Sequence, residues 1–241
     1  MINIPYIPEI NIFSIKIHTW GLFAALAFLA AYLLSIKRTK YKDYISNQII
    51  LTLIASFIGA RILFIIENFQ LFSNNLLNIF YIWDGGLSSS GGIIFALIVS
   101  YIYSKKKNIS FLETGNILAP GIALAFLLGR IGCLFGDIHL GMQTTQYLPW
   151  AIMQNSIPSH PIKLYYILAL SLVLITIYLV NKFKKHVEFY ILTITYSITR
   201  FISEFFVLEP RYLNLTIAQS VSIGLLILTL TLLIIKTKHK A

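Results

Sequence analysis

The chain has 241 residues, of which 57% are hydrophobic and only 12% are charged, and its formal net charge is +10. A soluble domain usually carries about 25% charged residues, so this composition excludes an ordinary water-soluble protein and predicts an integral membrane protein. The single cysteine, Cys133, excludes an internal disulfide.

Seven apolar segments follow one another along the chain, most of them close to the roughly 20 residues that a helix needs to cross a bilayer. They lie at 17–36, 45–66, 88–104, 117–135, 164–180, 189–207 and 215–235. No internal repeat and no soluble domain is visible in the sequence. We therefore expect an all-α polytopic membrane protein with seven transmembrane helices, a single membrane domain over residues 1–241.

The loop charges predict an orientation. Thirteen of the nineteen lysines and arginines lie in alternate loops, after the first, third, fifth and seventh segments. Loops rich in Lys and Arg usually stay in the cytoplasm, so we expect the N-terminus outside and the C-terminus in the cytoplasm. The same loops suit anionic lipid headgroups, and the positive charge therefore does not require a nucleic-acid partner.

Arginines interrupt three of the apolar segments, at Arg61, Arg130 and Arg200. A charge in hydrocarbon costs at least ~2.5–3.5 kcal/mol on insertion scales, so such residues usually face a cavity or a ligand. A guanidinium can hold a phosphate through paired hydrogen bonds, which predicts an anionic ligand inside the membrane. The alternative for Arg130 is a side chain that reaches the interface from a helix end.

A glycine-rich stretch opens the third segment, where Gly85-Gly86 and Gly91-Gly92 flank serines that include Ser90. Glycines let backbone N–H groups approach a ligand closely, and a helix N-terminus favours an anion. A turn in which a serine caps the helix is the alternative interpretation.

Two further polar groups lie in the second half of the chain. Tyr196, Arg200 and Glu204 recur at every fourth position, so a helix places them on one face, where Arg200 and Glu204 can pair. His160 precedes the fifth segment. For the pair the alternative is a purely structural contact, and for His160 it is a helix cap or hydrogen-bond partner.

These groups occur in the order seen in the bacterial prolipoprotein diacylglyceryl transferases, and the chain resembles that family from about His18 to Phe206. The resemblance is carried by His18-x-Trp20-Gly21-Leu22, Gly59-Ala60-Arg61, Trp83-x-Gly85-Gly86-Leu87 with Gly91-Gly92, Gly129-Arg130-Ile131-Gly132, Gly141 with Thr144 and Pro149-Trp150, His160-Pro161 with Leu164-Tyr165, and Arg200-Phe201-Ile202-x-Glu204-Phe205-Phe206. No single string is specific, but the ordered set is.

The resemblance implies a bacterial inner-membrane transferase of seven helices. It would move the diacylglyceryl group of phosphatidylglycerol onto the thiol of a lipobox cysteine in a preprolipoprotein. We also expect a monomer that uses neither a cofactor nor a metal. By the same resemblance, Arg130 and Arg200 hold the phosphate and stabilise the leaving group, while Glu204 orients Arg200. The Gly85–Gly92 loop frames the headgroup, and Ser90 and Tyr196 donate hydrogen bonds. The expected substrate-binding set also contains Arg61, Gly141 and His160.

The chain departs from the family pattern at several positions. Ser90 stands where the family has a histidine, its proposed general base, and Lys163 and Tyr166 replace a glutamine and a glutamate. If catalysis is retained, another group must accept the thiol proton. Our candidate is His139, because an imidazole titrates near neutral pH, although a loop histidine without a role is equally compatible with the sequence.

Two other functions stay open from the sequence. One is a family relative that uses another acceptor or has lost catalysis. The other is a lipid-binding or transport protein, although a transporter is expected to show repeated halves, and the sequence has no such duplication.

Overall fold

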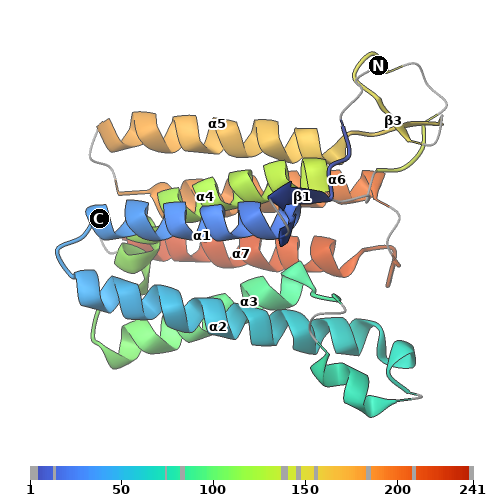
Figure 1. Ribbon diagram of the computed structural model, residues 1–241. Coiled ribbons are helices and arrows are strands. Elements are labelled where there is room, and N and C mark those ends of the chain that lie inside the picture. Colours follow the sequence, from blue (N-terminus) through green and yellow to red (C-terminus); the bar gives the residue numbers. More distant parts are fainter. Residues whose placement is uncertain are drawn as a thin grey trace. The chain divides into compact units, whose positions relative to one another are not determined.

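The computed structural model describes residues 5–12, 15–73, 75–81, 85–136, 141–144, 148–154, 157–182, 186–207 and 210–238. Its α-helices, coloured along the sequence in Figure 1, are α1 (Thr19–Lys37), α2 (Lys42–Glu67), α3 (Ser89–Lys106), α4 (Phe111–Gly136), α5 (Ile162–Lys182), α6 (Glu188–Ser203) and α7 (Ile217–Lys238). Each of these seven helices in the described ranges overlaps one of the seven expected segments.

Five of the described helices, α1, α2, α4, α5 and α7, are long and apolar enough to cross a membrane. The other two fall short for reasons visible in their sequences. α3 begins with Ser-Ser-Gly-Gly and ends in two lysines, and α6 has only 16 residues, among them Glu188 and Arg200. A polytopic helical membrane protein is therefore confirmed.

Two short antiparallel hairpins were not expected from the sequence. β1 (Glu9–Ile12) pairs with β2 (Ile15–His18), and β3 (Ile152–Gln154) pairs with β4 (Ile157–Ser159). The expectation of a helix from residue 17 was wrong by two residues, because Ile17 and His18 belong to β2. The alternating Ile-Lys-Ile-His string has the period of a strand, and the helix starts only at Thr19, whose hydroxyl donates to the Ile7 carbonyl (2.5 Å).

The chain divides into two compact units, residues 39–114 and the remainder. The larger unit contains α1, most of α4, and α5 to α7, and it is built around buried residues of α4, α5 and α6. These residues are Ala119, Ala123, Val173, Ile177 and Leu192.

Small residues let α1 approach α4 closely. A Cβ at Gly121 would lie 2.7 Å from the Ala31 carbonyl oxygen, and one at Gly132 would lie 2.5 Å from the Cβ of Phe23. Such glycines are typical of packing between membrane helices, where van der Waals contact replaces the hydrophobic effect. The C-terminal end of α4 therefore lies beside the N-terminal end of α1. The segment before α1 contacts the same end of α4, where the backbone N–H of Ile7 donates to the Phe135 carbonyl (2.8 Å).

The smaller unit is the α2–α3 pair with two short 3₁₀ helices, η1 (Phe69–Leu71) and η2 (Leu76–Phe80). The two long helices are joined by hydrogen bonds inside an otherwise apolar contact. Gln48 donates to the Ser100 hydroxyl (2.6 Å), and the hydroxyls of Tyr44 and Ser104 lie 3.0 Å apart. Polar contacts of this kind hold membrane helices together.

Candidate functional site

The polar residues of the larger unit gather where α4 and α6 end and α5 and α7 begin. The backbone N–H of Met142, after α4, donates to the carbonyl of Phe206, after α6 (2.6 Å). Thr216, before α7, donates from its hydroxyl to Glu204 (3.1 Å). Loops and helix ends thus bring together Met142 and Phe206, which are 64 positions apart in the sequence. Such clusters of loops and helix ends often carry functional residues, so we expect a site at this end of the unit.

Tyr166 lies between two of the arginines. Cζ of Arg130, from α4, lies over the Tyr166 ring at 4.2 Å from its centroid, and Cζ of Arg200, from α6, lies at 5.7 Å. The Tyr166 hydroxyl also accepts a hydrogen bond from Nη1 of Arg200 (3.2 Å). The structure therefore brings Arg130 and Arg200 to one side chain, as expected for two residues that share a ligand.

Arg200 is held by a buried carboxylate. Its Nη2 lies 2.8 Å from Oε1 of Glu204, which is 1% exposed. The other oxygen of Glu204 accepts from Thr216, whose backbone N–H and hydroxyl exchange two hydrogen bonds with Gln219 at the start of α7 (both 3.0 Å). This capping box fixes the carboxylate, and the predicted Arg200–Glu204 pair is confirmed.

Arg130 has a different environment. Among the described residues, its half-buried guanidinium makes neither a hydrogen bond nor an ion pair, and its one close polar contact is the Tyr166 ring. A guanidinium carries five N–H donors in its plane, and a ring contact on its face uses none of them. Arg130 is therefore a cation whose donors are available to a ligand.

His160 belongs to an aromatic cluster beside this group. Its ring packs on Phe206 with centroids 4.6 Å apart, and its Nδ1 lies 3.3 Å from the Tyr165 hydroxyl, which also accepts from the Trp150 indole N–H (3.1 Å). Gly141 donates its N–H to the His160 carbonyl (3.2 Å), and a Cβ there would lie 2.5 Å from the same oxygen. Gly141 and His160 thus connect the segments that precede α5. For His160 these contacts agree with the alternative interpretation as a hydrogen-bond partner.

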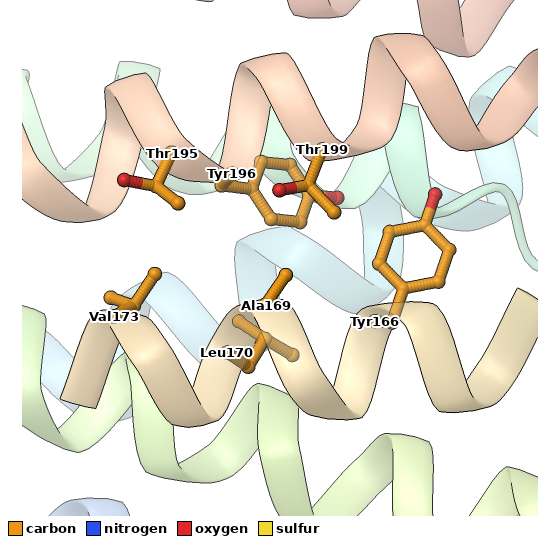
Figure 2. Close-up of a pocket in the computed structure, with 7 residues that line it drawn as sticks. All are labelled: Tyr166, Ala169, Leu170, Val173, Thr195, Tyr196 and Thr199. Carbon is orange, nitrogen blue, oxygen red and sulfur yellow. The ribbon is translucent and has the colours of Figure 1, made fainter. Parts of the chain in front are cut away.

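Tyr196 lines a small cavity between α5 and α6 that begins at Tyr166 (Figure 2). The cavity has a volume of about 10 Å³. A water needs at least ~10–15 Å³ and drug-sized ligands occupy roughly 300–1,000 Å³, so this cavity is too small for any part of a lipid headgroup. Tyr196 also packs on Phe126 (5.2 Å between centroids).

Arg61, in the smaller unit, is hydrogen-bonded to backbone, and the substrate-binding role that we expected for it stays a prediction. It is 9% exposed, and all five of its N–H donors are used. Their acceptors, at 2.6 to 3.1 Å, are the backbone carbonyls of Asn78, Ile79, Tyr81, Gly85 and Gly86. In this arrangement every N–H of the guanidinium has a carbonyl acceptor. These five hydrogen bonds offset the free-energy cost of burying the charge.

The glycine pairs, for which we expected an anion-binding loop, have close contacts of their own in the structure. Gly85 and Gly86 have positive φ (84° and 81°), and this conformation turns their carbonyls toward Arg61. Gly91 and Gly92 pack against α2, where a Cβ on Gly91 would meet the Gly59 carbonyl and one on Gly92 would lie 2.8 Å from the Ser56 hydroxyl. The glycines thus take part in a loop and in a helix contact, and their expected contact with a lipid headgroup stays a prediction.

Ser90 is buried in the first turn of α3. His139 lies outside the described residues, so its proposed role stays a prediction.

Lys163 and Tyr166 were not proposed as site residues from the sequence. They were noted only as departures from the family pattern. Tyr166 is 2% exposed, and the Lys163 ammonium, one turn earlier on the same helix, donates to the Cys133 carbonyl (2.7 Å). Cys133 is one turn beyond Arg130. The spacing of three in both helices could have indicated that the two pairs face each other.

Comparisons with known proteins match the chain along most of its length. The family model described as prolipoprotein diacylglyceryl transferase matches residues 8–235. The phosphatidylglycerol–prolipoprotein diacylglyceryl transferase of Finegoldia magna is 33% identical over 225 residues, 90% of each chain. The proteins of the same name from Clostridioides difficile and Clostridium botulinum (strain Langeland) are each 34% identical, over 201 residues (80% of each chain) and 219 residues (86% of each chain). The chain belongs to the prolipoprotein diacylglyceryl transferase family.

Proposed function

We propose that the protein transfers the diacylglyceryl group of phosphatidylglycerol to the lipobox cysteine of a preprolipoprotein. Family membership supports the reaction, and the observation that carries the proposal in the structure is the pair of arginines on Tyr166. One of them, Arg130, donates no hydrogen bond to any residue that the structure describes, and the other, Arg200, is fixed by Glu204.

The chemistry explains why a cation with available donors is needed. The cysteine sulfur attacks the glyceryl carbon, a C–S bond forms, and the C–O bond to the phosphate breaks. The leaving glycerol phosphate takes the electron pair, so a phosphodiester with one negative charge becomes a phosphomonoester with two. Donors that point at this developing charge lower the barrier, because they bind the transition state more strongly than the intact lipid.

Arg130 is our proposed stabiliser of that charge, and Arg200 holds the same phosphate from the neighbouring helix. Glu204 keeps Arg200 oriented, and its bond from Thr216 keeps the carboxylate from turning away. In this proposal Arg61 contributes by holding in place the backbone carbonyls of residues 78, 79, 81, 85 and 86. The thiol proton goes to a base for which His139 is our candidate.

We also propose the finer topology. Seven spans, with α3 and α6 as the two spans beyond the five long apolar helices, place the N-terminus outside and the C-terminus in the cytoplasm of the bacterial inner membrane. The alternate placement of thirteen Lys and Arg supports this orientation. The protein acts as a monomer, and its partners are phosphatidylglycerol, the preprolipoprotein and membrane lipids.

The test is transfer by the purified protein in detergent micelles. Phosphatidylglycerol and a lipobox peptide should yield a diacylglyceryl thioether peptide by mass spectrometry and an equal amount of glycerol phosphate. Phosphatidylcholine in place of phosphatidylglycerol, or a peptide with serine for the lipobox cysteine, should yield neither product. A lipid-binding protein without catalysis would bind phosphatidylglycerol yet form no thioether, and that result would reject the proposed function.

A further inference from the structure

We propose that Tyr166 is a positioning residue that directs the guanidinium groups of Arg130 and Arg200 toward one phosphate. The inference rests on the proposed function and adds a residue to it. Tyr166 belongs to α5, whereas the arginines belong to α4 and α6, so this one side chain joins three helices.

The two arginines use different parts of Tyr166. Arg130 lies over the ring face, 4.2 Å from the centroid, and Arg200 donates to the hydroxyl at 3.2 Å while its Cζ is 5.7 Å from the same centroid. In Figure 2 the ring leaves α5 with its hydroxyl toward α6. With 2% of its surface exposed, the ring has little freedom to turn, so both guanidinium groups have a fixed support.

A neutral aromatic support suits a phosphate site better than a carboxylate. The donors of a guanidinium lie in its plane, so a ring on its face orients the group and leaves every N–H free. A carboxylate would occupy donors and offset part of the charge, as Glu204 does through Nη2 of Arg200. Tyr166 thus keeps Arg130 both oriented and fully charged.

The ring also reduces the repulsion between the two cations. Both Cζ atoms lie within 6 Å of one centroid, and the negative face of the ring attracts each of them. Without the ring, two positive groups close together in a medium of low polarity would separate, and a single phosphate could no longer meet both.

Three substitutions separate this role from ordinary packing. Tyr166→Phe keeps the ring under Arg130 and removes the hydroxyl bond to Arg200, whereas Tyr166→Leu removes both. Leu170→Ala is the control, because Leu170 is buried one turn further along α5, lines the same cavity, and as an aliphatic side chain offers neither arginine a hydrogen-bond acceptor or an aromatic ring. Phosphatidylglycerol binding, kcat and the melting temperature are measured for each protein in micelles.

Tyr166→Leu should weaken phosphatidylglycerol binding relative to Tyr166→Phe by roughly 2- to 30-fold, the range of a lost cation–π contact. When both variants also carry Arg130→Ala, Tyr166→Leu should bind phosphatidylglycerol almost as well as Tyr166→Phe, because the ring then has no Arg130 to support. Leu170→Ala should lower the melting temperature and keep the binding of the wild type.

Three results would overturn the inference. Wild-type binding and kcat in Tyr166→Leu would do so, as would an equal Phe-to-Leu step in the presence and absence of Arg130→Ala. A loss of binding in Leu170→Ala as large as that in Tyr166→Leu would show a packing effect only. The binding measurements decide the inference even when no thioether forms, so its failure is distinguishable from failure of the proposed function.

Discussion

Replacing Gly121 by alanine should separate α1 from α4 and lower the stability of the protein. The added Cβ would lie 2.6 Å from the Ser35 hydroxyl oxygen and 2.7 Å from the Ala31 carbonyl oxygen. Ser35 is buried and the carbonyl is backbone, so neither atom can move without shifting α1. Overpacking of this kind costs about 1–3 kcal/mol, whereas alanine gains about 0.8–1.0 kcal/mol over glycine within a helix.

The net expectation for Gly121→Ala is a loss of roughly 1–2 kcal/mol in the free energy of unfolding, taking the upper part of the overpacking range because one obstacle is backbone. Gly129→Ala is the matched control, since it lies on the same helix and its Cβ would meet nothing within 4 Å. The control should keep or slightly raise the melting temperature.

Thermal unfolding in detergent measures both variants. Adding Ser35→Ala to Gly121→Ala should recover part of the loss, because the nearest obstacle is then gone. Equal shifts in Gly121→Ala and Gly129→Ala would refute the close α1–α4 contact, as would a destabilised control beside an unaffected Gly121→Ala.

Three further changes test single contacts. Arg61→Lys leaves at most three donors for five carbonyls, so limited proteolysis at residues 75–81 should become faster than in the wild type; an unchanged cleavage rate would argue against the carbonyl cluster. Glu204→Gln leaves Arg200 without its buried counter-charge, a loss that typically costs about 3–5 kcal/mol, and phosphatidylglycerol should raise the melting temperature of this variant more than that of the wild type; equal shifts would contradict the shared phosphate. Gly141→Ala forces a Cβ to 2.5 Å from the His160 carbonyl and should lower the melting temperature by disturbing that loop; a wild-type melting curve would show that the loop is not tightly packed there.

The helices were predictable because an apolar run of bilayer length indicates both a helix and its approximate ends. Each run from 17–36 to 215–235 contains a helix, and the Arg200–Glu204 pair followed from a spacing of four. Short strands give a weaker signal. β2 has only four residues of alternating pattern, and because a longer apolar run follows it directly, the sequence was interpreted as a helix from residue 17.

The partners of Arg61 could not be predicted because they are backbone atoms. Its acceptors lie 17 to 25 positions later, in a loop whose path depends on two residues with positive φ. Sequence spacing identifies side chains that share a helix face, but it does not show where carbonyls of a loop converge. The expectation of a ligand at Arg61 was reasonable for a buried charge, yet the loop itself satisfies that charge.

Glycine was ambiguous for a related reason. It serves a ligand-binding loop, a turn with positive φ and a close helix contact equally well, and only the neighbours of Gly86 and Gly91 distinguish these uses. Tyr166 was overlooked as a site residue because a tyrosine in an apolar run is usually a lipid-interface residue. Its role depends on two arginines from other helices, and their meeting is a property of the tertiary fold.

The central claim is that Arg130 stabilises the charge that develops on the leaving phosphate, and kcat for Arg130→Lys tests it most directly. Lysine keeps the positive charge but lacks the planar fork, so the variant should lose about one charge-assisted hydrogen bond of roughly 1.5–3 kcal/mol, or about 10- to 150-fold in kcat. Gly129→Ala, the neighbouring substitution with open space around it, should keep the wild-type kcat. Wild-type turnover in Arg130→Lys and Arg130→Ala, measured as thioether peptide formed from phosphatidylglycerol, would contradict the account.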